Sequence, residues 1–257
     1  MELGPFLLLF GAAVGIGTLA SLLGIGGGSF IVPLLTLAGF AATTQQAVGT
    51  SSAAIVFTSL SSSIVYARRR AIDIRMGLLL MPTTAAGAWL GAYLTRLFSA
   101  RWLAVAFAVF LLYPAATLLL AHSEEAREGQ RPSRAGARLI AIAAPLGLLA
   151  GIAAGLFGIG GGTVMVPALT FLLGVDIRTA VATSLFVMAP SAAVAALQHG
   201  VQGNLRLELA LPLILGIVIG AQIGPRLAPR VPTRRLRQLF GLVLLYAAAN
   251  MAWKALR

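Results

Sequence analysis

The sequence contains one glycine-rich phrase twice, and each copy interrupts a long apolar stretch. Residues 23–33 read LGIGGGSFIVP and residues 157–167 read FGIGGGTVMVP, so that Gly160 follows Gly26 by 134 positions. A helix in a lipid bilayer satisfies its own backbone hydrogen bonds, and a break is tolerated only where it faces protein or water. Paired breaks at corresponding places in two halves of a chain indicate a site near the middle of the membrane.

The apolar stretches themselves predict a membrane protein. Hydrophobic residues make up 59% of the chain and charged residues only 10%, which is far from the composition of a soluble domain. Two short apolar pieces, 29–40 and 163–174, have 12 residues each, and a helix of that length covers only ~18 Å. The other runs reach the roughly 20 residues that a helix needs to cross a bilayer. These expected long helices cover residues 4–23, 44–66, 75–97, 102–121, 138–157, 178–198, 207–227 and 236–256.

The duplication extends beyond the glycine phrase. Residues 48–51 read VGTS and residues 181–184 read VATS. The only long polar stretch, 122–138, is rich in charge, glycine and proline, as is typical of a linker. We therefore expect an all-α polytopic membrane protein with two homologous halves, each made of four long transmembrane helices and one short glycine-rich broken helix. Its parts are a first repeat at 1–121, a polar linker at 122–137 and a second repeat at 138–257.

The distribution of positive charge predicts how the halves are oriented. If the short pieces re-enter the membrane, the loops on one side hold 11 Lys and Arg residues and the loops on the other side hold 8. If each short piece instead carries the chain across, the halves are inverted and the tally becomes 14 against 5. Cytoplasmic loops carry an excess of Lys and Arg. We therefore favour inverted repeats with both termini outside.

Composition excludes several classes of function. The net charge of +12 does not indicate nucleic-acid binding, because the Arg residues lie in short loops between apolar runs. The chain has no cysteine, and no ionisable residue falls in the middle of an expected span, where proton relays and catalytic carboxylates would be needed. We therefore expect no metal site, no cofactor and no enzyme. His199, near the end of a span, is interpreted as a rim histidine that holds a loop.

The glycine phrases supply the candidate binding site. Consecutive glycines leave backbone N–H groups open and allow a positive φ, and amides arranged in this way form concavities that bind anions. Short helices that begin near Ser29 and Thr163 would point their positive ends inward. Close helix packing is the alternative explanation for the glycines, and bonding to neighbouring helices is the alternative for the hydroxyls. The candidate substrate-binding residues are Gly24, Gly26, Gly27, Gly28, Ser29, Thr50, Ser51, Gly158, Gly160, Gly161, Gly162, Thr163, Thr183 and Ser184.

Two copies of G-x-G-G-G-x-x-x-V-P, each followed by an apolar piece and a V-x-T-S segment, resemble the TauE/SafE family, also called the toluenesulfonate uptake permeases. The resemblance covers residues 5–256. It implies a permease or exporter in the bacterial cytoplasmic (inner) membrane that moves sulfite, sulfoacetate, a sulfonate or a related anion. The second half departs from the first where Ala182 stands in place of Gly49 and Leu185 in place of Ser52.

We therefore expect a secondary transporter that works by alternating access around the paired glycine breaks, with a small anion and the lipid bilayer as its partners. A proton is the candidate coupling ion, although no carboxylate is placed to carry it and the anion itself can carry it as a weak acid. Two alternatives remain open. A passive anion channel would not accumulate its substrate against a gradient, and a non-transporting membrane scaffold would have only residues 122–138 as an extramembrane surface.

Overall fold

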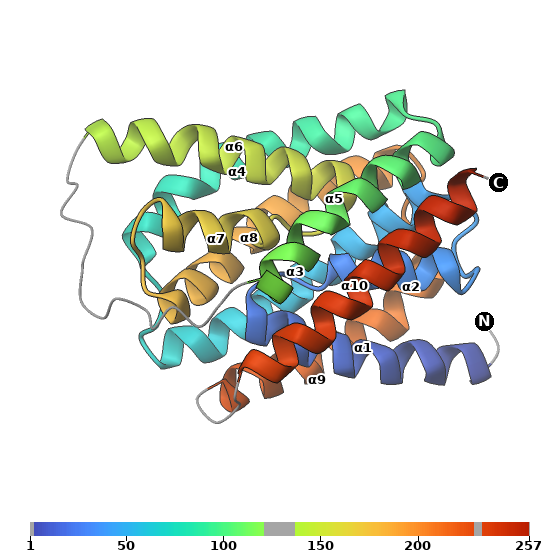
Figure 1. Ribbon diagram of the computed structural model, residues 1–257, viewed down its shortest axis with the longest axis horizontal. Helices are drawn as coiled ribbons and strands as arrows, with labels where there is room; N and C mark the ends of the chain where they lie inside the picture. The colour runs from blue at the N-terminus through green and yellow to red at the C-terminus, as the bar shows by residue number, and fades with distance from the viewer. Residues whose placement is uncertain (1–2, 121–136, 229–232, 257) are drawn as a thin grey trace.

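The computed structural model describes residues 3–120, 137–228 and 233–256, and the regular elements within these ranges are all helical. Most of the helices run along the long axis of the molecule (Figure 1). They match the runs expected from the sequence to within three residues at either end. In chain order they are α1 Leu3–Leu23, α2 Gly28–Leu37, α3 Thr44–Arg68, α4 Ile74–Leu94, α5 Ala100–Leu120, α6 Ala137–Phe157, α7 Gly162–Phe171, α8 Ile177–Val201, α9 Leu207–Leu227 and α10 Thr233–Leu256, with a 3-10 turn at Thr95–Leu97 after α4.

Helix length divides the elements into two classes. Six helices in the described ranges are long and apolar enough to cross a membrane, namely α1, α3, α4 with its 3-10 turn, α5, α8 and α9. α6 and α10 have comparable lengths, 21 and 24 residues. α2 and α7 have only 10 residues each, about half of what a span needs. The protein is therefore an all-α multi-spanning membrane protein, as predicted.

Polar residues at the ends of the spans fix where three long helices begin. The Thr43 hydroxyl caps α3 by accepting the Gln46 N–H, and the Asp73 carboxylate caps α4 by accepting the Met76 N–H. Asp176 caps α8 in the same way. A side chain that accepts from the first turn satisfies one of the N–H groups that a helix start leaves open. Two of the few acidic residues therefore have a structural role outside the membrane interior.

Small residues bring the helices of two pairs into backbone contact. In the pair α1–α9, a Cβ atom added to Gly220 would overlap the Val14 carbonyl oxygen, and one added to Gly224 would overlap the Thr18 carbonyl oxygen. From the first contact to the second, the residue numbers rise by four on both helices, so α1 and α9 are parallel. The pair α4–α6 is built in the same way, with Gly151 against Thr84. Without a hydrophobic driving force between helices in lipid, close packing of this kind holds them together.

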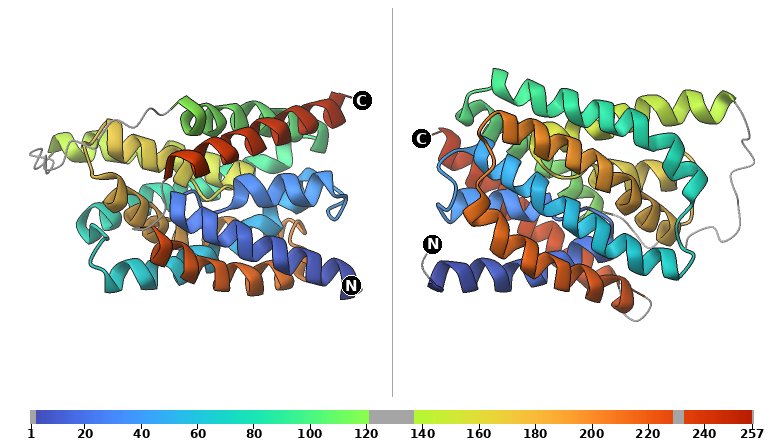
Figure 2. Two further views of the ribbon diagram at one scale, coloured as in Figure 1. Left: turned by 60° about the horizontal axis from the view of Figure 1, so that its bottom comes forward. Right: turned by 180° about the vertical axis from the view of Figure 1, so that it is seen from behind.

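The helices α3 and α8 form the centre of the molecule and are antiparallel. Sixty-seven per cent of each of their spans is buried, against 39% for α1, α4 and α5. Gly49 near the start of α3 lies against His199 near the end of α8. At the opposite end of the pair, Thr183 near the start of α8 accepts the Asp73 N–H just after α3. The other long helices surround this pair (Figure 2).

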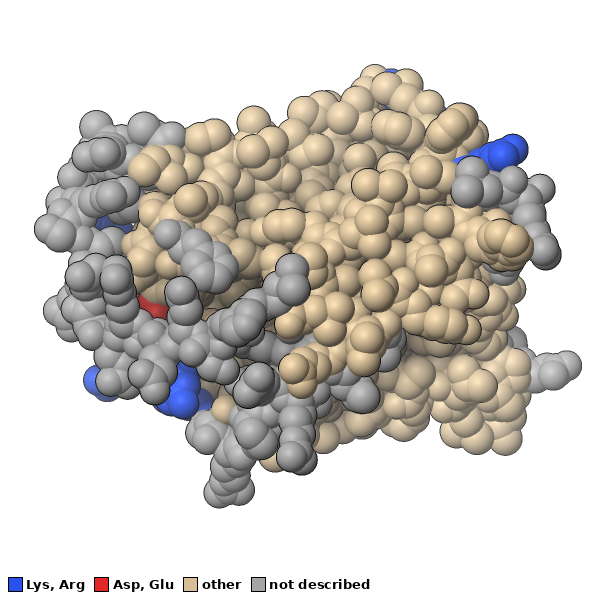
Figure 3. All heavy atoms as spheres, viewed as in Figure 1, with Lys and Arg blue, Asp and Glu red and all other residues tan. Residues whose placement is uncertain are grey.

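The helix ends carry the described charges. Both chain ends lie at one end of the molecule, and α6 begins at the other (Figure 1). On the face drawn in Figure 3, the described Lys, Arg, Asp and Glu side chains lie toward the ends, and a broad uncharged belt lies between them. The described Asp, Glu, Lys and Arg side chains are all exposed or half-buried. This distribution is that of helices which cross a bilayer and turn at its surfaces. The linker predicted at 122–137 lies almost wholly outside the described residues.

Candidate functional site

The two glycine phrases fold into two loops with the same backbone conformation. We call residues 24–27, between α1 and α2, the first glycine loop and residues 158–161, between α6 and α7, the second. In the first loop, φ is +72° at Gly24, +75° at Gly26 and +97° at Gly27. The matching values in the second loop are +62° at Gly158, +82° at Gly160 and +80° at Gly161. Residues with a Cβ atom rarely adopt this left-handed region, so the positions of the glycines follow from the path of the chain.

The two glycine loops lie in direct contact. A Cβ atom at Gly28 would overlap the Gly158 carbonyl oxygen, and a Cβ atom at Gly162 would overlap the Gly24 carbonyl oxygen. Each short helix thus begins against the first glycine of the opposite loop. Close packing accounts for Gly28 and Gly162, and backbone conformation accounts for Gly27 and Gly161. At these points of contact the loops leave no room for an anion between them.

The loops meet at the middle of the central helix pair. Gly26 and Gly160 both face the side chains of Ile55 and Met188. Ile55 is the twelfth of the 25 residues of α3, and Met188 is the twelfth of the 25 residues of α8. The breaks therefore lie about halfway along the membrane-spanning pair. Ile55 and Met188 are not among the residues predicted for the site, although they stand 133 positions apart, close to the spacing of the glycine phrases.

One serine on each central helix makes a hydrogen bond to the glycine loop of the opposite half. The Ser51 hydroxyl on α3 donates to the Gly158 carbonyl oxygen over 2.8 Å. The Ser184 hydroxyl on α8 is 3.1 Å from the Gly24 carbonyl oxygen and 2.9 Å from the Val181 carbonyl oxygen in its own helix. In this structure both hydroxyl protons are therefore directed at backbone carbonyls and orient the loops.

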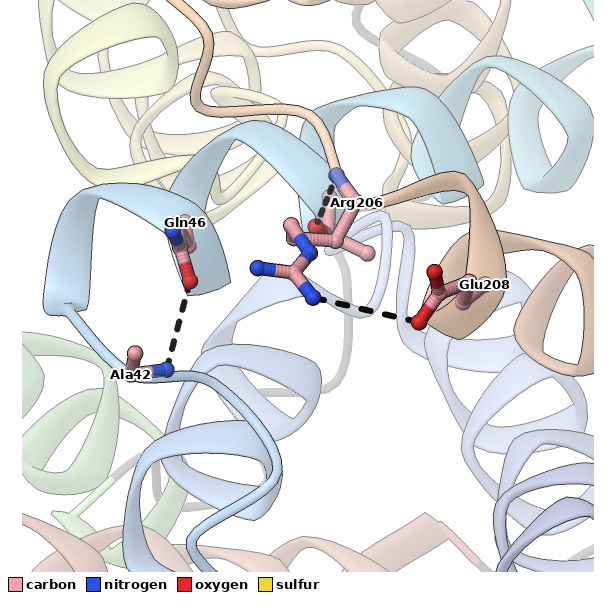
Figure 4. Close-up of polar contacts among 5 residues, drawn as sticks. Ala42, Gln46, Arg206 and Glu208 are labelled. Carbon is pink, nitrogen blue, oxygen red and sulfur yellow. Dashed lines mark hydrogen bonds and ion pairs between the residues drawn. The ribbon is translucent and has the colours of Figure 1, made fainter. Parts of the chain in front are cut away.

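Two threonines make an equivalent pair of contacts nearer the ends of the helices. Thr50 accepts the Arg206 N–H over 3.2 Å, and Thr183 accepts the Asp73 N–H over 3.0 Å. Both hydroxyls are fully buried, and within the described part of the chain neither donates a hydrogen bond. Figure 4 shows Arg206 lying between Gln46 of α3 and Glu208 of α9. The structure thus places Thr50 and Thr183 outward from the central contact, on opposite sides of it.

The starts of the two short helices hold donors that are not used. Ser29 in α2 is 0% exposed and Thr163 in α7 is 2% exposed, and neither hydroxyl has a hydrogen-bond partner in the described part of the chain. Within the same ranges, the backbone N–H groups of residues 26–29 and 160–163 find no acceptor. A buried polar group without a partner costs about 1–3 kcal/mol. Residues 26–29 and 160–163 therefore each form a group of buried, unpaired donors at the positive end of a short helix.

Outside the glycine loops, further hydrogen bonds join segments far apart in the chain, among them those of Tyr66, His199 and Gln222. The Tyr66 hydroxyl donates to the Ser21 carbonyl oxygen over 3.0 Å, and His199 Nε2 lies 2.9 Å from the Gly155 carbonyl oxygen. His199 was expected at the membrane rim. It is fully buried and holds the end of α6. The Gln222 amide, which needed a partner inside an apolar run, donates to Ser61.

The asymmetry between the repeated segments has a local cause at one position. A Cβ atom at Gly49 would lie 2.6 Å from the Asn204 carbonyl oxygen and 3.0 Å from the His199 Cβ atom. Gly49 is therefore required by the close approach of the end of α8. In the second half, Ala182 corresponds to Gly49. In the first half, Tyr66 corresponds to His199.

Comparison with known proteins agrees with this architecture. The family model described as sulfite exporter TauE/SafE matches residues 9–251, which include both glycine loops. The probable membrane transporter protein YunE of Bacillus subtilis is 34% identical over 211 residues, covering 74% of this chain and 76% of YunE. The probable membrane transporter protein YdhB of the same organism is 31% identical over 188 residues, covering 73% of this chain and 76% of YdhB.

A probable membrane transporter protein of Xylella fastidiosa is 25% identical over 199 residues, covering 77% of this chain and 76% of that protein. No solved structure matches the chain. The family match spans nearly the whole sequence, and YunE and YdhB exceed 30% identity over more than two thirds of the chain. This chain therefore belongs to the TauE/SafE family of membrane transporters.

Proposed function

We propose that this transporter moves a small sulfur oxyanion or organosulfonate, such as sulfite, sulfoacetate or a related sulfonate, across the bacterial inner membrane. The substrate class comes from the family, whose description names sulfite. The proposed site forms from the two glycine loops and the first turns of α2 and α7 when the loops move apart. The observation that carries the proposal is the pair of buried, unpaired hydroxyls of Ser29 and Thr163 at the starts of these helices.

Neutral donors suit this task. An anion in a site of low dielectric needs donors to replace its hydration, and helix starts with free N–H groups provide them. Oxyanions accept hydrogen bonds from backbone amides and hydroxyls without a salt bridge, so the substrate can also leave. The described charged side chains lie outside the buried centre. We propose that residues 26–29 and 160–163 supply the contacts, and that Thr50 and Thr183 line the route toward either side.

We further propose that the two halves are inverted repeats. Three kinds of contact support this relation: the antiparallel pair α3–α8, the reciprocal contacts of the glycine loops, and hydrogen bonds that recur at matching positions, such as Ser51 with Gly158 and Ser184 with Gly24. The described arginines follow the same arrangement. Among the arginines whose side chains the structure describes, six lie at the end of the molecule where α3 ends and three lie at the other end: Arg68, Arg69, Arg70, Arg75, Arg178 and Arg226 against Arg96, Arg101 and Arg206.

Transport then requires the loops to separate. Because both halves make the same contacts here, we take this arrangement as a state closed to both sides, and access from one side opens when one half shifts relative to the other. The bonds from Ser51 and Ser184 to the opposite loops are the contacts that such a shift exchanges. In an inverted pair, the two open states are related by exchanging the conformations of the halves.

Flux into liposomes tests the proposal. The purified protein is reconstituted and screened with sulfite, sulfoacetate, taurine and sulfate, and liposomes without protein report leakage. We expect saturable uptake of at least one sulfur anion, acceleration by unlabelled substrate on the opposite side, and loss of both in Gly161→Val. A passive channel would show no acceleration by exchange. Equal flux in protein-free liposomes for the whole panel would contradict transport.

A further inference from the structure

His199 combines features that the proposed transport site does not yet explain. It is 0% exposed, and within the described ranges Tyr66 is the only other ionisable side chain that is buried. Its Nε2 atom lies 2.9 Å from the Gly155 carbonyl oxygen. A carbonyl can only accept, so Nε2 carries the hydrogen and Nδ1 presents a lone pair. Nδ1 is buried and has no partner in the described part of the chain.

The position of His199 couples it to the central contact. Gly155, to which it donates, is three residues before Gly158 in the second glycine loop. Gly49, which packs against its Cβ atom, is two residues before Ser51. Ser51 and Gly158 are themselves joined by a hydrogen bond of 2.8 Å. His199 therefore contacts both chain segments that meet at this bond, and a change in the imidazole acts on each of them.

Burial of the His199 ring opposes an added positive charge, and the ends of two helices offset part of this cost. Gly155 is in the last turn of α6, and His199 is in the last turn of α8. The negative ends of two helix dipoles therefore converge on the ring, where a protonated histidine is stabilised. Charged residues on the elements packed around it are Arg96 after α4 and Arg206 and Glu208 at the start of α9, and the last two pair with each other at 3.8 Å. α3 and α6 bring no described charge to this end.

We propose that His199 is the proton-binding site that couples transport to the proton gradient, an inference that rests on the proposed anion transport. When the site opens to one side, a proton from the water there forms an N–H bond with the Nδ1 lone pair, and the imidazolium returns it to water when the site faces the other side. Nothing is oxidised or reduced. The imidazolium supplies one positive charge for the anion that the neutral donors bind. Tyr66 makes the equivalent bond to Ser21 in the other half and stays neutral, so one proton moves per cycle.

His199→Tyr tests the coupling, because it places the donor of the first half at the matching position of the second. Proteoliposomes receive a pH gradient, and methanesulfonate, sulfoacetate and sulfite serve as probes. Methanesulfonate keeps its charge over the range of about pH 5 to 8 in which histidine titrates. We expect the gradient to drive accumulation in the wild type. In His199→Tyr we expect accumulation to fall at least about tenfold, within the usual range of coupling between two sites, while exchange of the same probe across the membrane continues.

Tyr66→Phe is the matched control, since it removes the equivalent bond without touching the imidazole, and it should still respond to the pH gradient. A wild type that exchanges a probe but ignores the gradient overturns the coupling and leaves the proposed transport intact. The same holds if His199→Tyr accumulates the probe as the wild type does. Failure of the wild type to move any probe overturns transport and coupling together.

Nuclear magnetic resonance decides the case in which His199→Tyr loses exchange as well. The chain has two histidines, so His122→Gln leaves His199 as the only imidazole. With nitrogen-labelled histidine, we expect a hydrogen on Nε2 alone at high pH and a second one on Nδ1 as the pH falls. An imidazole that stays neutral from about pH 8 to pH 5 has a purely structural role and contradicts the proposal.

Discussion

Gly27 and Gly161 show at the scale of single residues why the repeated phrase has glycine where it does. Each is the N-cap of a short helix with a left-handed backbone, at φ +97° and +80°. A side chain at such a φ costs about 1–2 kcal/mol. Gly174 offers a comparison, because it also has a positive φ, +67°, but no heavy atom lies within 4 Å of a Cβ built on it.

Replacing these glycines by alanine separates strain from function. We expect Gly27→Ala and Gly161→Ala to lower the free energy of unfolding by about 1–2 kcal/mol each and to reduce anion flux strongly. Gly174→Ala should lower stability by a similar amount and keep its flux. Thermal unfolding in detergent and uptake into liposomes measure the two effects. Wild-type flux in Gly161→Ala would contradict a role of this loop in transport.

The unpaired hydroxyls of Ser29 and Thr163 allow a test in which function should fall without a loss of stability. Ser29→Ala and Thr163→Val remove buried groups that make no hydrogen bond in the described chain, so stability should stay equal or rise, while the KM for the anion should increase. Ser51→Ala removes a bond to the second glycine loop and should lower the free energy of unfolding by about 1 kcal/mol. A loss of stability in Ser29→Ala without a change in KM would show that its role is packing.

At the scale of elements, two pairs of parallel helices, α1–α9 and α4–α6, flank the antiparallel pair α3–α8. The flanking pairs depend on backbone contact at glycines, whereas the central pair carries the polar contacts to the glycine loops. The closest helix packing and the proposed binding site therefore reside on different helices. This division lets the centre keep unpaired donors while glycine packing holds the outer pairs together.

Gly220→Val tests the packing of α1 against α9. The new side chain overlaps the Val14 carbonyl oxygen, and overpacking of this kind costs about 1–3 kcal/mol or more. We expect a lower melting temperature and a smaller monodisperse fraction in detergent. Gly11→Val on α1 is the control, because no heavy atom lies within 4 Å of its Cβ position, and its melting temperature should stay near that of the wild type. Equal melting of both variants would mean that this contact does not hold the pair together.

For the whole molecule, the direction of each helix connects the fold to the membrane. The chain ends lie at one end of the molecule (Figure 1), and for the full sequence the inverted arrangement assigns 5 Lys and Arg residues to that side and 14 to the other. Because cytoplasmic loops carry an excess of Lys and Arg, we expect the side with 14 to face the cytoplasm.

Reporter fusions test this orientation. We expect alkaline phosphatase fused after Arg257 to be active outside the cell, and a green fluorescent protein at the same place to stay dark. Fusions at residue 130, in the predicted linker, should show the reverse. A fluorescent C-terminal fusion would contradict the inverted arrangement and favour re-entrant short helices.

The sequence alone predicted much of this protein. Apolar runs about 20 residues long located the eight long helices, because a bilayer demands that length. Glycines four residues apart, such as Gly216, Gly220 and Gly224, indicate the packed helix faces in the sequence, since only small residues allow two helix backbones to touch. The doubled phrase located the two broken helices, because three glycines in a row permit a backbone that other residues avoid.

Tertiary structure alone decided which groups meet. The partner of Ser51 lies 107 residues away and that of Ser184 lies 160 residues away, and no local pattern encodes such pairs. The burial of His199 and the need for Gly49 also follow from the packing of α8 against α3 and α6. Local sequence sets the backbone preference and the hydrophobicity of each segment. Hydrogen-bond partners and burial depend on how segments from the two halves fit together in space.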